Sequence, residues 1–196
     1  MRAVALLLIV TANLHAQTDV TKAPKNWYPI VKGHKWTYRT SGATLVQEVV
    51  AIEKIGKTEC AKIAVKIGDE VVSTEHIAVT KEGVFRHAIG GNRILPPVPV
   101  IKFPLKFNKA WEVKSSVQGQ LVEGKMIAEK KPLEIGKKVF TDAILVQTVG
   151  TMKAAGQDIK MEMWFAPNIG MLKQVVTVGK ISTTLTIVLD EKKVPK

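Results

Sequence analysis

Cysteine is almost missing from this 196-residue chain. Its one cysteine, Cys60, excludes an intramolecular disulfide and with it the class of disulfide-dense miniproteins. Cys60 lies in an alternating, strand-like run, 59–67, and a catalytic thiol would need an electropositive, partly exposed setting beside a histidine. We therefore interpret Cys60 as a buried, inert thiol; a thiol available to a partner is the alternative.

Motifs of catalytic and metal sites are also missing. The three histidines beyond residue 16, His34, His76 and His87, form neither HxxxH nor HExxH spacing. The chain has no Gly-x-Ser-x-Gly elbow, no glycine-rich phosphate loop and no Asp-x-Asp-x-Asp-Gly calcium loop. We therefore predict no catalytic residue, no cofactor and no metal site, which makes an enzyme the least supported class. His34 precedes Trp36 in a turn and is expected to be exposed.

Paired carboxylates are a further possible catalytic arrangement. Glu75 and Glu162 occupy matching positions in the two similar segments described below, so a sheet could bring them together as an acid and a base. The simpler interpretation, which we favour, is two strand carboxylates that pair with lysines.

Arginine is scarce although the chain is basic. The 29 basic residues outnumber 17 acidic ones, giving a net charge of +12, but the arginines are only Arg2, Arg39, Arg86 and Arg93. Nucleic-acid readers rely on the bidentate guanidinium, so we predict no nucleic-acid partner. The lysines are spread along the chain. Spread lysine is typical of solvated strand faces and protected edges, and attraction to an anionic envelope surface is the alternative.

Long apolar runs are missing after the first sixteen residues, so we predict no transmembrane segment. Met1-Arg2, the apolar run 3–10 and the small residue Ala16 match a signal peptide spanning 1–16; an ordinary buried strand or helix is the alternative. Gln17 at the cut is not cysteine, which argues against a lipidated N-terminus. We expect an exported protein, periplasmic or extracellular, with one domain over 17–196.

The composition and residue pattern of the chain favour β-strands. Valine, isoleucine and threonine are abundant, apolar and polar residues alternate, and no long window carries a capped helical stripe. Short helical turns near 27–33 and 102–108 are the only helical elements that the sequence allows. We predict an all-β fold, a single antiparallel open barrel or sandwich of about eleven strands. The expected strands lie near 36–41, 44–55, 58–67, 71–80, 84–88, 110–118, 120–130, 138–149, 158–166, 171–178 and 181–190.

Two segments of the chain resemble each other. Residues 28–36 align without gaps to 103–111, and residues 75–86 match 162–173. The shared pattern is aromatic-Pro-aliphatic, then Gly33 or Asn108 for a left-handed turn, then a tryptophan that begins a strand. We predict an internal repeat, 28–86 and 103–173, whose second copy carries its extra residues between 118 and 160.

The segment that joins the two copies, 87–102, is rich in glycine and proline. Pro96, Pro97 and Pro99 lack backbone N–H groups and are expected to exclude a central strand. We interpret the segment as a crossover between two half-sheets; a lid or binding loop is the alternative.

The repeat motifs resemble those of poorly characterised exported bacterial β-rich proteins. The residues that carry the resemblance are Tyr28-Pro29-Ile30 with Gly33, Trp36, Tyr38 and Arg39, and Trp164-Phe165-Ala166-Pro167 with Gly170-Met171. Some proteins of this kind are similar to the periplasmic lipoprotein-carrier superfamily. That resemblance implies an unclosed antiparallel barrel of about eleven strands.

The aromatic residues supply the remaining functional signal, either as core or as the lining of an apolar pocket on a concave face. The preferred hypothesis is an exported, non-enzymatic binding module for a hydrophobic or envelope-derived ligand. The alternatives are a lysine-rich structural or adhesion protein of the envelope and, least supported, an envelope hydrolase. The aromatic candidates are Trp27, Tyr28, Trp36, Tyr38, Phe85, Phe103, Phe107, Trp111, Phe140, Trp164 and Phe165.

Overall fold

The computed structural model describes residues 25–189 as β-strands joined by turns and short loops, with no helix among them. Hence no helix within this range has the length and apolarity to cross a bilayer. The predicted signal peptide, 1–16, lies outside the described residues. The expected all-β, antiparallel architecture is confirmed.

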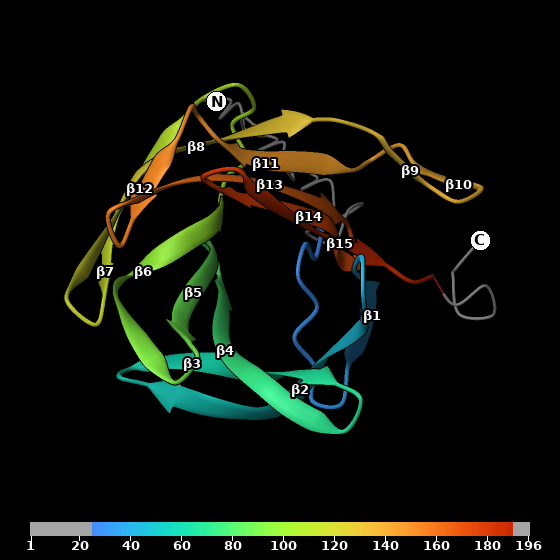
Figure 1. The fold of residues 1–196 in the computed structure, drawn as a ribbon, viewed down its shortest axis with the longest axis horizontal. Helices are drawn as coiled ribbons and strands as arrows, with labels where there is room; N and C mark the ends of the chain where they lie inside the picture. The colour runs from blue at the N-terminus through green and yellow to red at the C-terminus, as the bar shows by residue number, and fades with distance from the viewer. Residues whose placement is uncertain (1–24, 190–196) are drawn as a thin grey trace, which may run out of the picture.

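The first six strands form one half of the barrel, each paired antiparallel with the next in the chain (Figure 1). Their bounds are β1 (Lys35–Arg39), β2 (Thr44–Ile55), β3 (Thr58–Ile67), β4 (Glu70–Thr80), β5 (Gly83–Ile89) and β6 (Asn92–Lys102).

The remaining strands form the other half, in the order β7, β8, β11, β13, β14 and β15. Short β12 pairs with β8 and β13, and β9 and β10 form a separate hairpin. The bounds are β7 (Trp111–Val117), β8 (Gln120–Lys130), β9 (Leu133–Ile135), β10 (Lys138–Phe140), β11 (Ile144–Thr148), β12 (Met152–Ala154), β13 (Gln157–Ala166), β14 (Gly170–Val178) and β15 (Ile181–Ile187).

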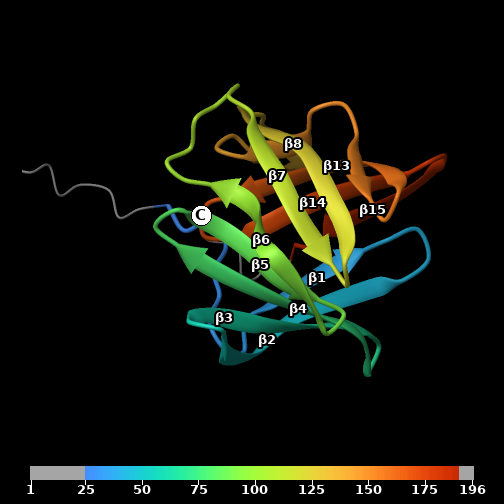
Figure 2. The same ribbon diagram turned by 90° about the vertical axis from the view of Figure 1, so that its left-hand side faces the viewer.

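Two seams join the halves and close a ring of twelve strands (Figures 1 and 2). At the first seam, β6 and β7 pair only through Ile94–Val117 and Leu95–Ser116. At the second, β1 and β15 pair only through Tyr38–Ile187 and Arg39–Thr186. Each seam is therefore short, although a further backbone bond, from Val188 N–H to Thr37 O, extends the second one.

The expectation that Pro96, Pro97 and Pro99 exclude a central strand from the segment 87–102 is wrong, because β6 runs through it between β5 and β7. Pro96 and Pro97 fall where the pairing with β5 is irregular, between the partners of Arg86 and Ala88. The β7 side of β6 is unpaired beyond Leu95. The missing N–H groups of these prolines therefore cost no ladder hydrogen bond, which removes the usual objection to proline in a strand.

One other prediction about local structure, a single strand over 138–149, is wrong. The expected strand 138–149 is divided into β10 and β11 by a turn in which Ala143 N–H donates to Phe140 O. No helix forms near 27–33 or 102–108: each segment makes a single hydrogen-bonded turn, and other backbone N–H groups there bond to strands. Gly33 N–H donates to Val49 O, and Asn108 N–H donates to Ala128 O.

The two segments aligned by sequence have similar local geometry. Gly33 and Asn108 both have positive φ, at 85° and 59°. Trp36 is the second residue of β1 and Trp111 the first residue of β7, and both are buried. Each indole N–H donates to a backbone carbonyl, Trp36 to Ile169 O at 2.6 Å and Trp111 to Pro99 O at 3.2 Å. Common origin of the two copies remains a prediction.

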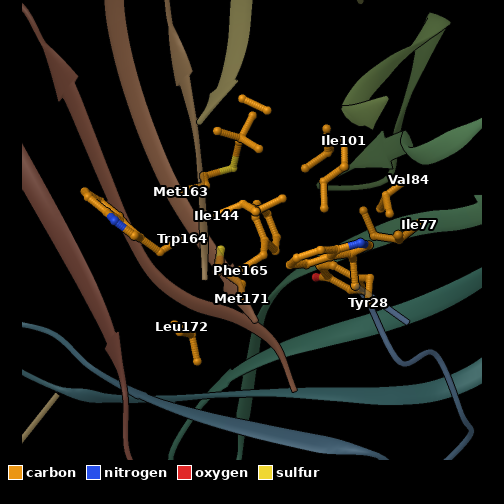
Figure 3. Close-up of a cluster of buried hydrophobic side chains, with 14 of the residues drawn as sticks. Tyr28, Ile77, Val84, Ile101, Ile144, Met163, Trp164, Phe165, Met171 and Leu172 are labelled. Atoms are coloured by element: carbon orange, nitrogen blue, oxygen red, sulfur yellow. The ribbon is translucent and has the colours of Figure 1, made fainter. Parts of the chain in front are cut away.

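Packed side chains fill the barrel interior (Figure 3). The ring centroid of Tyr28 is 6.3 Å from that of Phe165 in the second half, and Ile77 of the first half belongs to the same cluster of buried side chains (Figure 3). Tyr38 is fully buried and donates to Met171 O at 3.0 Å. Eight of the aromatic candidates are buried: Trp27, Tyr28, Trp36, Tyr38, Trp111, Phe140, Trp164 and Phe165.

One end of the barrel is covered by chain segments, and we call it the capped end. It carries the segment 25–34, the turn 81–82, the loop 103–110 and the turn 167–169. Backbone bonds tie these pieces together: Asn168 N–H donates to Asn26 O at 2.6 Å, and Phe103 N–H donates to Glu82 O at 2.7 Å. The opposite end consists of hairpin tips.

Candidate functional site

An apolar groove of about 690 Å³ opens at the capped end. We call it the aromatic groove. Its volume lies in the range of about 300–1,000 Å³ that is usual for small-molecule sites. The apolar side chains that line it are Trp27, Tyr28, Ile30, Val79, Phe103 and Leu105, with Pro104 between the last two.

Three separate pieces of chain supply the groove: the segment before β1, the end of β4, and the loop after β6. The first piece is fixed by the side chain of Asn26, whose Oδ1 accepts from Tyr28 N–H at 3.2 Å. The aligned repeat triplets, Tyr28-Pro29-Ile30 and Phe103-Pro104-Leu105, both contribute to the lining. The two copies of the motif, which are far apart in the sequence, therefore lie next to each other at this groove.

Lysines border the groove on several sides. Lys25 and Lys81 line it directly, and a neighbouring hollow of about 410 Å³ shares Lys25, Trp27 and Leu105 with it. The ammonium of Lys130 lies 5.3 Å from the centroid of the Phe107 ring in that hollow. Aromatic surface beside ammonium groups suits a ligand that is apolar at one end and anionic at the other.

A second neighbouring hollow, of about 240 Å³, lies at the seam between β6 and β7. It is lined by Lys102, Lys106 and Lys109 together with Phe103, Pro104, Ala110 and Trp111. We call it the lysine pocket. Since Phe103 and Pro104 also line the aromatic groove, the two hollows are adjacent.

Two other hollows carry no aromatic side chain. One, of about 510 Å³, lies between the β9–β10 hairpin and the end of β15. The other, of about 620 Å³, lies beside the tips of β13, β14 and β15. The aromatic groove is therefore the better candidate for an apolar ligand.

A charged pair lies within the barrel near the groove. Arg86 Nε donates to Glu75 Oε2 at 3.0 Å, and the two side chains are only 19% and 13% exposed. Burial, followed by the Glu75 charge, raises the pKa of the Tyr28 hydroxyl far above its usual value. Tyr28 therefore stays neutral and contributes apolar ring surface and a hydroxyl, not a nucleophile.

Glu75 and Glu162 do not form an acid–base pair. Glu75 pairs with Arg86, which corrects the expectation that it pairs with lysine. Glu162 lies opposite Gln147 and Val175 on the neighbouring strands, and no ion pair joins it to another residue of 25–189.

Cys60 is buried on β3 opposite Glu53 of β2, the carboxylate that contacts His76. Its Sγ lies 3.7 Å from Thr58 O, and burial, with a smaller contribution from the Glu53 charge, raises the pKa of its thiol. A raised pKa disfavours the thiolate, which is the nucleophilic form. The geometry therefore agrees with the interpretation of Cys60 as a structural residue.

The three histidines lie apart from the groove. His34 is half-buried against Trp36, with ring centroids 4.5 Å apart. The expectation that His34 is exposed is therefore wrong. His76 Nε2 lies 2.6 Å from Glu53 Oε1. His87 is buried on β5. No cluster of histidine, cysteine and acidic side chains suited to a metal ion occurs within residues 25–189.

Stability should fall on mild acidification, partly through His87. Burial, then the Arg93 and His76 charges, lowers the pKa of His87, so the unfolded chain accepts a proton there more readily than the folded protein. The contribution of neutral His87 to the free energy of unfolding is therefore fully present above the pKa of the unfolded chain, about 6.5. This contribution declines as the pH falls below that value. His87→Gln should reduce the loss in urea midpoint between pH 7.5 and 5.5; an unchanged loss would contradict this assignment.

Comparison with known proteins adds no assignment: no protein family matches the chain, and neither a curated protein nor a solved structure gives a significant match.

Sequence reasoning named several of the groove's aromatics but not the groove. Ile30, Val79, Leu105 and the lysines were missed as site residues. The available signal was the repeat motif itself. Two copies of an aromatic-Pro-aliphatic triplet, each leading into a strand at the same end of a barrel, predict that the triplets approach each other.

Proposed function

We propose that this protein is a non-enzymatic binding module that holds the apolar chain of an amphiphile in the aromatic groove. The observation that carries the proposal is the groove's size and lining, six apolar side chains around about 690 Å³. Aromatic rings give a large contact area with little loss of side-chain freedom, and Val79 is 37% exposed at the groove although it is apolar. Covering this surface would favour binding.

The site is the groove and not the barrel interior. A carrier that enclosed its ligand would need an empty apolar centre, whereas side chains from both halves fill this one. Tyr28 closes the interior from the capped end, with its ring 5.4 Å from that of Trp36. We therefore propose that the ligand lies across the capped end and remains partly open to solvent.

Export is part of the proposal through the predicted signal peptide, 1–16. Outside the cytoplasm, the most abundant amphiphiles are those of the envelope. The resemblance to the lipoprotein-carrier superfamily is a further reason to test acyl chains.

Adhesion to an anionic surface through lysine is the second candidate function. The observation in its favour is the net charge of +12 together with the lysines that gather at the capped end. Binding of that kind needs no apolar chain and weakens steeply with salt. The two functions are separated by a neutral amphiphile, which only the groove would bind.

The groove is tested with monomeric dodecyl maltoside, a neutral amphiphile, by isothermal titration calorimetry. Val79→Glu places a charge in the groove at a partly exposed position, and we expect at least about a tenfold loss of affinity, or about 1.4 kcal/mol. The matched control is Val139→Glu, at an exposed valine of β10 outside the groove, which should bind like the parent. Absence of binding by the parent, or equal losses in both variants, would overturn the proposal.

A further inference from the structure

We infer that the lysine pocket binds the anionic head group of the amphiphile whose chain lies in the aromatic groove. The inference rests on the proposed function and adds the chemical class of the ligand: an amphiphile with one apolar chain and a carboxylate, phosphate or sulfate head.

The pocket arises where the barrel wall is incomplete. Beyond Leu95, β6 has no partner on β7, and the loop 103–110 connects the separated ends of the two strands. The lysine pocket has a volume of about 240 Å³, which is smaller than the roughly 300 Å³ that a site for a whole ligand usually needs. A space of this size suits a head group but not an extended chain.

The charges around the pocket are uncompensated. Within residues 25–189, no carboxylate forms an ion pair with Lys102, Lys106 or Lys109. By contrast, the neighbouring lysines that line the groove have acidic partners: Lys25 with Asp142 at 2.7 Å and Lys81 with Glu82 at 3.8 Å. All three lysines are solvent-exposed, so a bound anion would meet positive charges that no carboxylate of residues 25–189 already neutralises through an ion pair.

The hydrogen-bond donors of the lysine pocket recognise the negative charge of a head group and not its shape. The indole N–H of Trp111, which also lines the pocket, is already used on Pro99 O. Recognition is therefore left to three ammonium groups, which are flexible point charges without the fixed fork of arginine. Such a set accepts carboxylate, phosphate and sulfate heads alike.

The lysines are not demanded by the turn that carries them. In the aligned first copy, Val31 and His34 occupy the positions of Lys106 and Lys109. Both copies nevertheless make the same turn, in which His34 N–H donates to Val31 O and Lys109 N–H donates to Lys106 O. The same backbone therefore forms without the charges, so the turn itself does not require Lys106 or Lys109.

Because the lysine pocket is adjacent to the aromatic groove, one molecule could occupy both. Phe103 and Pro104 line the groove on one side and the pocket on the other. A chain that lies along Leu105 and Tyr28 would therefore leave its head beside Lys102 at the end of β6.

The test compares dodecyl phosphate with dodecyl maltoside, two amphiphiles with the same chain, as monomers in the calorimeter. The parent protein should bind the phosphate at least about tenfold more tightly. The triple variant Lys102→Gln/Lys106→Gln/Lys109→Gln should lose that preference and keep its affinity for the maltoside. The charge-matched control Lys57→Gln/Lys160→Gln/Lys180→Gln, at exposed positions outside the pocket, should keep the preference.

The outcomes separate the two proposals. Binding of both amphiphiles without preference, or equal losses in the two triple variants, would overturn the head-group inference and leave the groove intact. Binding of neither would overturn both. Inorganic phosphate should compete only weakly; competition as strong as that of dodecyl phosphate would mean a site for the free anion. A charge effect seen only on anionic phospholipid vesicles, and not with monomers, would mean a membrane-docking surface and would overturn the inference.

Discussion

Gly83→Ala is expected to destabilise the protein by about 3 kcal/mol or more, or to prevent folding. Gly83 begins β5 opposite Lys102, and its φ is +149°, a conformation that side-chain-bearing residues rarely adopt. A Cβ added there would lie 2.1 Å from the carbonyl oxygen of Ile101. The clash is with backbone, so β5 and β6 would have to separate at the point where the groove and the lysine pocket begin.

The control is Gly42→Ala, in the turn between β1 and β2. No atom would lie within 4 Å of the added Cβ, so a change within about 0.5 kcal/mol is expected. Urea denaturation followed by tryptophan fluorescence measures both variants. A Gly83 variant as stable as the Gly42 variant would mean that β5 and β6 are not packed as described.

Glu75→Leu is expected to cost about 3 kcal/mol, because it leaves the Arg86 guanidinium without its partner inside the barrel. The pair faces a largely apolar interior, beside Tyr28 and Tyr38, and both charged side chains are mostly buried. The double variant Glu75→Leu/Arg86→Leu removes both charges and should recover most of the loss.

A double-mutant cycle makes this test quantitative. If the double variant is as unstable as the sum of the two single variants, Glu75 and Arg86 do not act as a pair. If each single variant changes stability by less than about 0.5 kcal/mol, the pair is solvated, and the interior is more open than the structure indicates.

Local patterns of the sequence were sufficient for most strands. Alternation located β2 and β3, and the left-handed residues Gly33 and Asn108 adopt the positive φ that their turns require. These features depend on neighbours in the chain, so they can be predicted from one sequence. The antiparallel barrel follows from many such strands joined by short turns.

The errors occurred where tertiary pairing decides the structure. Proline is excluded from a strand only where the ladder needs its N–H, and nothing local reveals that β7 leaves that side of β6 unpaired. The pairing of Glu75 with Arg86 follows from the register of β4 and β5, including a bulge between His76 and Ile77. Neither the register nor the bulge is encoded in the spacing of residues along one strand.

The candidate site was predictable only in part. The aromatic-Pro-aliphatic triplets were recognisable from the alignment of the two copies, but their meeting at one end depends on the closure of the ring. The lysine pocket depends on the divergence of β6 from β7. Lys102, Lys106 and Lys109 look like any other spread lysines until that seam is known.

Photo-crosslinking tests the central claim most directly, with a single-chain anionic amphiphile that carries a diazirine in its alkyl chain. Peptide mass spectrometry should locate the label within 25–30, 79–81 and 103–105, the three pieces of chain that line the groove. Exposed apolar residues at the opposite end, Val71 and Ile181, provide an internal comparison. Labelling concentrated on the hairpins 68–72 and 179–183, or spread evenly over the surface, would contradict binding in the aromatic groove.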